Sequence, residues 1–151
     1  MKTKEIIKAY NIIKDIKVNS LSEDAALAIW KDVKVFRPIV EEYDKSIEEA
    51  KKSLQDDKLK EMNQRAQEYN KYAEEHKGEP MTPDMHKELN EINSYFSEVN
   101  AKLTKYIDEL QNADADVEVQ KVDDVEMLKA LKENGKTFED MEKIKGITRE
   151  A

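Results

Sequence analysis

The residues best suited to metal or acid–base chemistry lie in one short window, residues 76–86 (HKGEPMTPDMH). The window contains both histidines of the chain and two of its six methionines, and imidazole and thioether groups bind soft metal ions. A zinc or copper site needs about three or four well-placed ligands, whereas helical spacing places His76 and Met85 on apolar helix faces. Gly78 and Pro80 are typical of a chain reversal. The pattern therefore favours a turn over a metal site.

The acidic segment 112–123 (NADADVEVQKVD) matches a calcium-binding loop in its first half only. Oxygen-bearing side chains occupy positions 1, 3 and 5, as calcium coordination requires. Position 6 is Val117, where the loop needs glycine, and position 12 is Asp123 rather than glutamate. The valines, which alternate imperfectly with polar residues, indicate a short strand instead. We therefore expect neither a metal nor any other cofactor.

Side chains for catalysis are scarce in this sequence. The chain has no cysteine, two histidines and three glycines. It contains no Gly-rich phosphate loop, nucleophile elbow or paired-histidine helix motif. Nucleophilic and acid–base catalysis both depend on such groups. We predict that the protein is not an enzyme and has no catalytic or cofactor-binding residues.

The net charge of −8 comes from the second half of the chain. Residues 78–151 contain 18 acidic and 10 basic side chains, and residues 108–126 set eight acids against Lys121 alone. This sign opposes direct nucleic-acid binding. The acids could instead pair with the five lysines of residues 2–17, or mimic nucleic-acid phosphates toward a basic protein. The candidate interaction surface comprises this acidic patch and the tip of the turn: Asp114, Asp116, Glu118, Asp123 and Asp124, with Glu79 and Met81.

Two stretches of heptad spacing predict the helices that position these residues. Apolar or small side chains recur at alternating steps of four and three, which keeps one seam facing a partner helix, as in a coiled coil. The first run is Ile29, Val33, Phe36, Val40, Tyr43, Ile47, Ala50 and Leu54, and the second is Met85, Leu89, Ile92, Phe96, Val99, Leu103, Tyr106 and Leu110. After Leu54 the register slips and resumes at Met62, Ala66, Tyr69 and Ala73.

The predicted elements are an N-terminal helix within residues 1–20, a long helix over 22–77, a turn at 78–82, a helix over 83–111, and a short strand with two short helices in 112–151. Ser22 and Thr82 are suitable N-caps, and Thr82 precedes a proline at the first helical position. We expect the long helix to kink or to restart at Pro38, which removes one backbone hydrogen bond. The slip in heptad register near residues 55–58 indicates either a local change of the supercoil, with a second kink, or a break in the helix.

The lengths of the two predicted helices differ by a factor of two. At 1.5 Å per residue the long helix measures about 84 Å and the helix over 83–111 about 43 Å. The second helix can therefore cover only the distal half of the first. The proximal half, where we place Ile29, Trp30 and Phe36 in the core, must be covered by the N-terminal helix, Lys4–Lys17, and the last 40 residues.

The C-terminal segment contains signals for one strand and two helices. A strand is predicted over residues 116–122, for which the sequence identifies no partner and which could pair with another chain. Asp123 or Asp124 can cap a helix that stops near Gly135. A last helix begins with the capping box Thr137–Asp140 and ends at Gly146.

These observations predict a single all-α domain, built as a long antiparallel helical hairpin with coiled-coil-like packing. The segments YIDELQNADADVEVQKV and LKENGKTFEDMEKIKGI resemble a family of small helical-hairpin proteins of tailed phages and prophages. The resemblance implies a phage-encoded structural or accessory factor and carries no catalytic residues over to this chain.

The expected function is a non-enzymatic protein–protein interaction or assembly role, with a protein partner that could be a second copy. The alternative is a small acidic inhibitor, a host-defence antagonist or nucleic-acid mimic, that blocks a basic surface. The N-terminus lacks the apolar core of a signal peptide, and no apolar run approaches the roughly 18–20 residues that span a membrane. We therefore expect no membrane association and a cytoplasmic location, in the host cytoplasm or the virion if the protein is phage-encoded.

Overall fold

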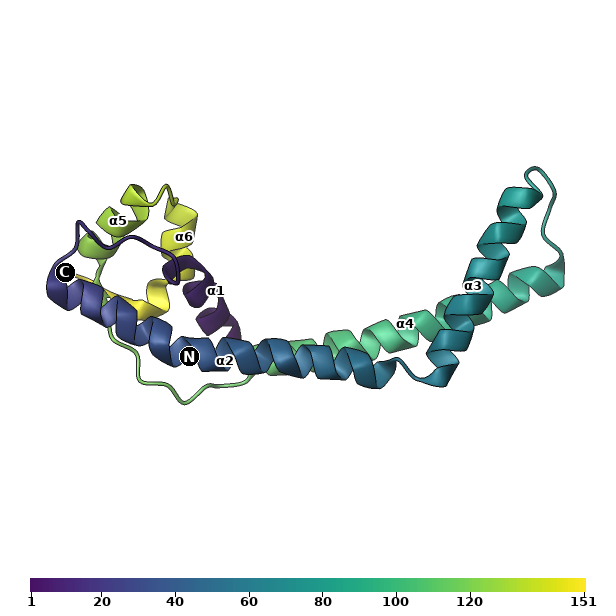
Figure 1. Ribbon diagram of the computed structural model, residues 1–151, viewed down its shortest axis with the longest axis horizontal. Helices are drawn as coiled ribbons and strands as arrows, with labels where there is room; N and C mark the ends of the chain where they lie inside the picture. Colours follow the sequence, from purple (N-terminus) through teal and green to yellow (C-terminus); the bar gives the residue numbers. More distant parts are fainter. The chain divides into compact units, whose positions relative to one another are not determined.

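The computed structural model describes residues 1–151, and 74% of them are helical. The elements are α1 (Thr3–Ile13), α2 (Glu23–Leu54), α3 (Asp57–Glu75), α4 (Pro83–Asn112), β1 (Val122–Asp123), α5 (Asp124–Glu133), α6 (Phe138–Lys143), the 3-10 helix η1 (Lys145–Ile147) and β2 (Thr148–Arg149) (Figure 1). The predominance of helix confirms the prediction from composition. A small parallel sheet of β1 and β2 accompanies the helices. None of the helices combines the length and the apolar composition needed to cross a lipid bilayer.

The chain divides into two compact units. Unit 1 comprises residues 1–45 and 109–151, and unit 2 comprises residues 46–108. The boundary falls inside α2 and inside α4, so both helices contribute residues to both units.

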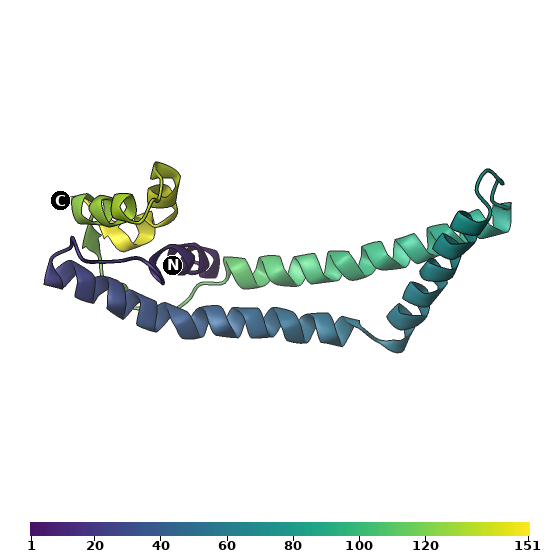
Figure 2. The same ribbon diagram turned by 45° about the horizontal axis from the view of Figure 1, so that its top comes forward.

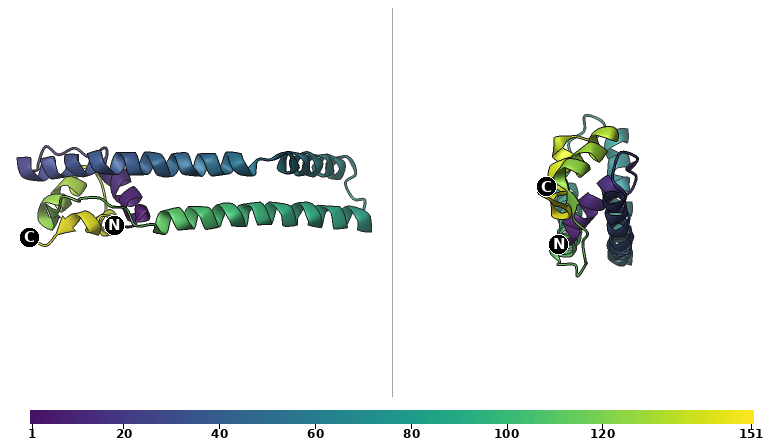
Figure 3. Two further views of the ribbon diagram at one scale, coloured as in Figure 1. Left: turned by 90° about the horizontal axis from the view of Figure 1, so that it is seen from below. Right: turned by 90° about the vertical axis from the view of Figure 1, so that its left-hand side faces the viewer.

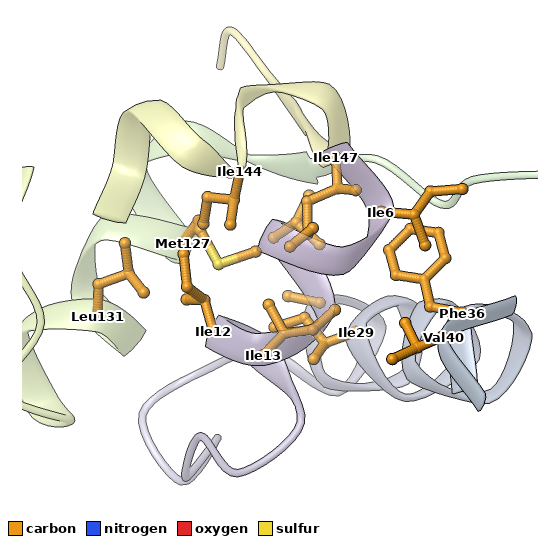
Figure 4. Packing of buried hydrophobic residues seen from close by; sticks show 13 residues of the cluster. Ile6, Ile12, Ile13, Ile29, Phe36, Val40, Met127, Leu131, Ile144 and Ile147 are labelled. Carbon is orange, nitrogen blue, oxygen red and sulfur yellow. The ribbon is translucent and has the colours of Figure 1, made fainter. Parts of the chain in front are cut away.

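Unit 1 contains every buried apolar side chain of the protein except Ile92. Its core joins both ends of the chain: α1 and α2 supply one part and the C-terminal segments the other (Figure 4). The cluster comprises Ile6, Ala9, Ile12, Ile13, Ala25, Ile29, Phe36, Val40, Val122, Met127, Leu131, Ile144 and Ile147. Burial of one such large side chain contributes about 1.5–3 kcal/mol. The predicted cover of the proximal long helix by the N-terminal helix and the last 40 residues is confirmed.

Trp30 was predicted to be part of this core, and that prediction is wrong. Its side chain is 56% exposed, and Lys34 Nζ lies 5.2 Å from the centre of its ring. Ile29 and Phe36 lie on the face of α2 that is buried in the core. The next residue along a helix is rotated by about 100°, which carries Trp30 to the flank of that face.

The N-terminal helix is shorter than predicted. Helix α1 ends at Ile13 rather than at Lys17. Beyond the helix, the side chain of Asn134 holds the backbone of Lys17, accepting from its N–H at 2.8 Å and donating to its carbonyl at 2.9 Å. These two hydrogen bonds fix an extended chain where the sequence pattern alone favoured another helical turn.

The last 30 residues follow most of the local signals in the sequence. Thr137 and Asp140 form the predicted capping box of α6. Gly135, with φ +69°, ends the helix before it, because this left-handed conformation favours glycine. The predicted strand over residues 116–122 is corrected: only Val122 of that range is in a strand, and β1 pairs with β2 inside the same chain. Alternation in the sequence identifies an extended chain but cannot identify its partner.

Unit 2 contains the end of α2, all of α3 and most of α4 (Figures 2 and 3). The predicted helix over 22–77 is two helices, because α2 ends at Leu54 and Asp56 caps α3 by accepting from the Leu59 N–H at 2.8 Å. Pro38 lies inside α2 without ending it. Thr82 caps α4 as predicted, with its hydroxyl 3.3 Å from the Met85 nitrogen.

Candidate interaction surfaces

The predicted acidic patch is divided by pairing within unit 1. Lys2 Nζ lies 3.0 Å from Asp114 Oδ1, and this hydrogen bond lowers the pKa of the Asp114 carboxyl. Arg149 Nε donates to Asp123 Oδ1 at 2.6 Å, which raises the pKa of Arg149 and links β2 to β1. The positive charges therefore neutralise two of the five predicted acids.

The other three acids of the predicted patch make no ion pair within the chain. Asp124 is half-buried at the first position of α5, where its negative charge interacts favourably with the helix N-terminus. Asp116 and Glu118 are exposed. Their two carboxylates are the part of the predicted acidic patch that is most available to a basic partner.

Residues 115–119 form a strand-like segment between α4 and β1. Ala115, Val117 and Val119 are half-buried and pack against the core, while Asp116 and Glu118 between them are exposed. This alternation is that of an extended chain lying on an apolar surface. The Ala115 N–H donates to the Met1 carbonyl at 3.0 Å and anchors the start of the segment.

Asp32 anchors the end of that segment from the interior of unit 1. The Asp32 side chain is fully buried, and its Oδ1 accepts from the Gln120 N–H at 2.7 Å. Its Oδ2 is buried without a hydrogen-bond partner. Burial raises the pKa of this carboxyl to about 6, against the opposing effects of the Gln120 hydrogen bond and the Lys121 charge. Sequence reasoning missed Asp32, because Gln120 lies 88 residues away.

The tip of the turn, residues 76–82, holds the other predicted surface residues. Glu79 is exposed and Met81 is half-buried. Gly78 has φ +86°, a value that the reversal requires and that favours glycine. His76 stacks on Tyr72 with ring centres 4.0 Å apart, and its Nδ1 lies 3.0 Å from the Tyr72 carbonyl oxygen. The structure brings together no three His, Cys, Asp or Glu side chains in a metal-binding group.

Polar side-chain contacts link α4 to α3 and its N-cap Asp56 in unit 2. Glu88 of α4 accepts a hydrogen bond from the Tyr69 hydroxyl and pairs with Arg65, both on α3. Closer to the start of α3, the Tyr95 hydroxyl lies 3.4 Å from Asp56 Oδ1, and Lys58 Nζ lies 4.6 Å from the centre of the Tyr95 ring. The later residues of α3 contact the earlier residue Glu88 of α4, and the start of α3 contacts the later residue Tyr95. The two helices therefore run in opposite directions.

The apolar seam of unit 2 is incompletely covered. Ile92 is its one buried residue, 1% exposed. The remaining seam positions are half-buried, apart from the exposed Ala73 and Tyr106: Ile47, Ala50, Leu54, Met62, Ala66, Tyr69, Met85, Leu89, Phe96, Val99 and Leu103. A groove of about 890 Å³ also runs between the two helices, with Met62, Tyr95 and charged side chains in its walls. Unit 2 therefore leaves its apolar seam partly accessible, although Tyr106 is the only large apolar side chain of the unit that is exposed.

Two further apolar surfaces lie in unit 1 and were not predicted. On α2, Leu27 and Trp30 are 48% and 56% exposed. Between α5 and α6, Val125 and Phe138 are 55% and 73% exposed and line a shallow groove with Met141. Apolar residue type was the available sequence signal, and it does not distinguish an exposed position from a buried one.

Comparison of the chain with models of known protein families, with curated proteins and with solved structures finds no match. The function is therefore inferred from the surfaces themselves.

Proposed function

We propose that this protein is a non-enzymatic interaction or assembly protein that binds a protein partner through the helices of unit 2. The observation that carries the proposal is the half-buried seam, in which Ile92 alone is fully covered. Large contiguous apolar surfaces on a protein mark sites of association. Heptad spacing supports a helical partner, because it keeps one face of a helix turned toward another helix.

The arrangement proposed for unit 2 is an antiparallel helical hairpin with coiled-coil-like packing, completed by helices of the partner. A second copy of this chain is the simplest such partner. Helix α3 is about 28 Å long, so two helices, each about 10 Å wide, present a face of about 560 Å². Two such faces bury about 1,100 Å² in total, which is near the lower limit for a specific interface. Unit 2 carries 14 acidic and 10 basic residues, a balance that limits repulsion between copies.

The biological setting is part of the same proposal. The C-terminal segments resemble those of tailed-phage and prophage helical-hairpin proteins, which supports a phage-encoded structural or accessory role. The protein would then act in the host cytoplasm or in the virion, without binding nucleic acid directly.

Light scattering of the full chain, over a range of concentrations, tests the assembly function. We expect a species of twice the 17.6 kDa chain mass. Val99→Asp places a charge in the half-buried seam and should return the mass to 17.6 kDa with unchanged helical circular dichroism. Asn100→Asp, at the exposed neighbouring position, is the matched control and should assemble as the wild type does. A wild-type chain that stays monomeric at every concentration contradicts self-assembly.

A second candidate function is a small acidic inhibitor of a basic protein. The observation in its favour is that Asp116 and Glu118 are exposed and make no ion pair within the chain. Self-assembly of unit 2 is not required for this function, so a monomeric chain that binds a basic protein would support it over the first candidate.

A further inference from the structure

The strand-like segment 115–119 is held in place at both ends but is unpaired between them. Its start is fixed by the hydrogen bond from the Ala115 N–H to the Met1 carbonyl, and its end by the hydrogen bond from the Gln120 N–H to Asp32. Beyond Gln120 the chain enters β1. The segment is the light-green connection between α4 and α5 in Figure 1. An extended chain fixed in this way loses little further conformational freedom when another strand pairs with it.

Backbone hydrogen-bonding groups are available along this segment. None of the backbone N–H groups of residues 116–119 donates a hydrogen bond within the chain, and none of their carbonyl groups accepts one. Five residues of extended chain span about 17 Å, a length typical of short strands. Unpaired strand edges recruit extended segments of other proteins through backbone hydrogen bonds.

We propose that residues 115–119 form a docking edge for an extended segment of a protein partner that carries lysine or arginine at alternate positions. Asp116 and Glu118 lie two residues apart, so they share one face of the extended chain. Basic side chains at every second position of an added strand would lie opposite these two carboxylates, and such opposite-charge pairs stabilise strand pairing. The apolar face beneath, formed by Val117 and Val119, is already covered by the core.

Charge excludes a second copy of this chain as the occupant of the edge. If two copies paired antiparallel through residues 115–119, acidic side chains would lie opposite acidic side chains, and like charges at such positions oppose pairing. Exposed charges on an edge strand are also a known defence against self-association. A basic partner reverses the sign of this interaction, so the same residues that prevent self-pairing select the partner.

This inference extends the second candidate function, the acidic inhibitor of a basic protein. It rests on that function only for the expectation that the partner is positively charged. It is independent of assembly through unit 2.

The test uses the full chain, labelled with ¹⁵N, and a seven-residue probe peptide in which valine alternates with lysine. We expect saturable binding and at least about tenfold slower hydrogen exchange at one or more of the amides of residues 116–119, because strand pairing protects backbone amides. A peptide with glutamate in place of lysine should not bind. The double variant Asp116→Lys, Glu118→Lys should no longer bind the lysine peptide and should bind the glutamate peptide.

The matched control is Glu74→Lys, Glu75→Lys, which makes the same change in net charge at two exposed positions of α3. It should bind the lysine peptide like the wild type. Binding without slower exchange at any of the four amides would overturn strand addition and leave only an ionic contact, so the acidic-inhibitor function would survive. Absence of saturable binding would also overturn the inference. Neither result bears on the mass measured by light scattering, which tests unit 2.

Discussion

Asp32 is the residue whose environment departs most from that expected of an exposed acid. Burial raises its pKa from 3.8 to about 6, so the neutral carboxyl persists to higher pH in the folded protein than in the unfolded chain. At pH values between these two pKa values, the Asp32 carboxyl is more often protonated in the folded state than in the unfolded state. The corresponding contribution to stability is present below pH 4 and is lost as pH rises through about 6.

We predict that Asp32→Asn removes this pH dependence. The asparagine carbonyl can still accept from the Gln120 N–H, and no buried charge remains. At pH 7.5 the free energy of unfolding should rise by about 1–3 kcal/mol, since one pKa unit corresponds to about 1.4 kcal/mol. Urea unfolding at pH 4.5 and 7.5 measures the difference between variant and wild type. Asp24→Asn, at an exposed position of the same helix, should change the free energy of unfolding by a similar small amount at both pH values. Parallel pH curves for Asp32→Asn and the wild type would disprove the assignment.

Sequence patterns predict single residues well where their partners are local. Thr82 and Thr137 could be assigned as caps because each bonds within three residues of itself. Asp32 could not be assigned, since a buried acid and an exposed acid look the same in a sequence and its partner Gln120 comes from another part of the chain. The sequence also could not show which acids of the predicted patch are paired, because the partners are distant in the chain. Asp123, for example, is neutralised by Arg149, 26 residues further on.

Among the longer helices, α3 is the one without a buried side chain, so its N-cap matters for its stability. Its residues include no fully buried side chain, so packing stabilises it less than α1 or α5. Asp56 accepts from the Leu59 N–H at the start of the helix and also lies near the Tyr95 hydroxyl of α4. The cap therefore stabilises both the helix and one of its contacts with α4.

We predict that Asp56→Ala lowers the free energy of unfolding by about 0.5–2 kcal/mol, as is typical for loss of an N-cap. Faster amide exchange in the first turn of α3 should accompany the loss. Asp57→Ala, one residue later and exposed, removes the same charge without removing the cap. Equal destabilisation by the two variants would show that charge rather than capping is responsible.

Element boundaries were predictable to the extent that local chemistry determines them. The break after Leu54 lies at the slip in heptad register, and the turn at 76–82 contains the glycine that its backbone requires. A strand was predicted over residues 116–122, whereas residues 115–121 have no regular secondary structure, and the hydrogen bonds of the Ala115 and Gln120 N–H groups go to Met1 and Asp32 instead of a neighbouring strand. Pairing is a long-range property that periodicity does not encode.

For the molecule as a whole, composition predicted the helical class, and the comparison of helix lengths predicted which segments cover α2. The degree of burial was not predictable. Nearly all complete burial is in unit 1, although heptad spacing is as regular in unit 2. Spacing identifies a face that can be buried, while the number of neighbouring helices determines how far it is buried.

We predict that Phe36→Ala destabilises unit 1 by about 3–5 kcal/mol, because it leaves a cavity in the core where the fully buried ring was. Residue-resolved hydrogen exchange should show the loss of protection in α1 and α5. Val35→Ala, at the neighbouring position where the side chain is 36% exposed, should cost far less. If both variants melted alike, the burial assigned to Phe36 would be incorrect.

Unit 2 lies between the two stretches that make up unit 1, residues 1–45 and 109–151, so it is an insertion within unit 1. The entropic cost of closing an inserted segment grows slowly, by about 0.6 kcal/mol for each doubling of its length. Paired removal or addition of seven-residue repeats in α3 and α4 would therefore change the reach of unit 2 while leaving the core of unit 1 intact. The same arrangement sets the order of synthesis: Ile144 and Ile147 follow unit 2 along the chain, so the core of unit 1 can close only after unit 2 has been synthesised.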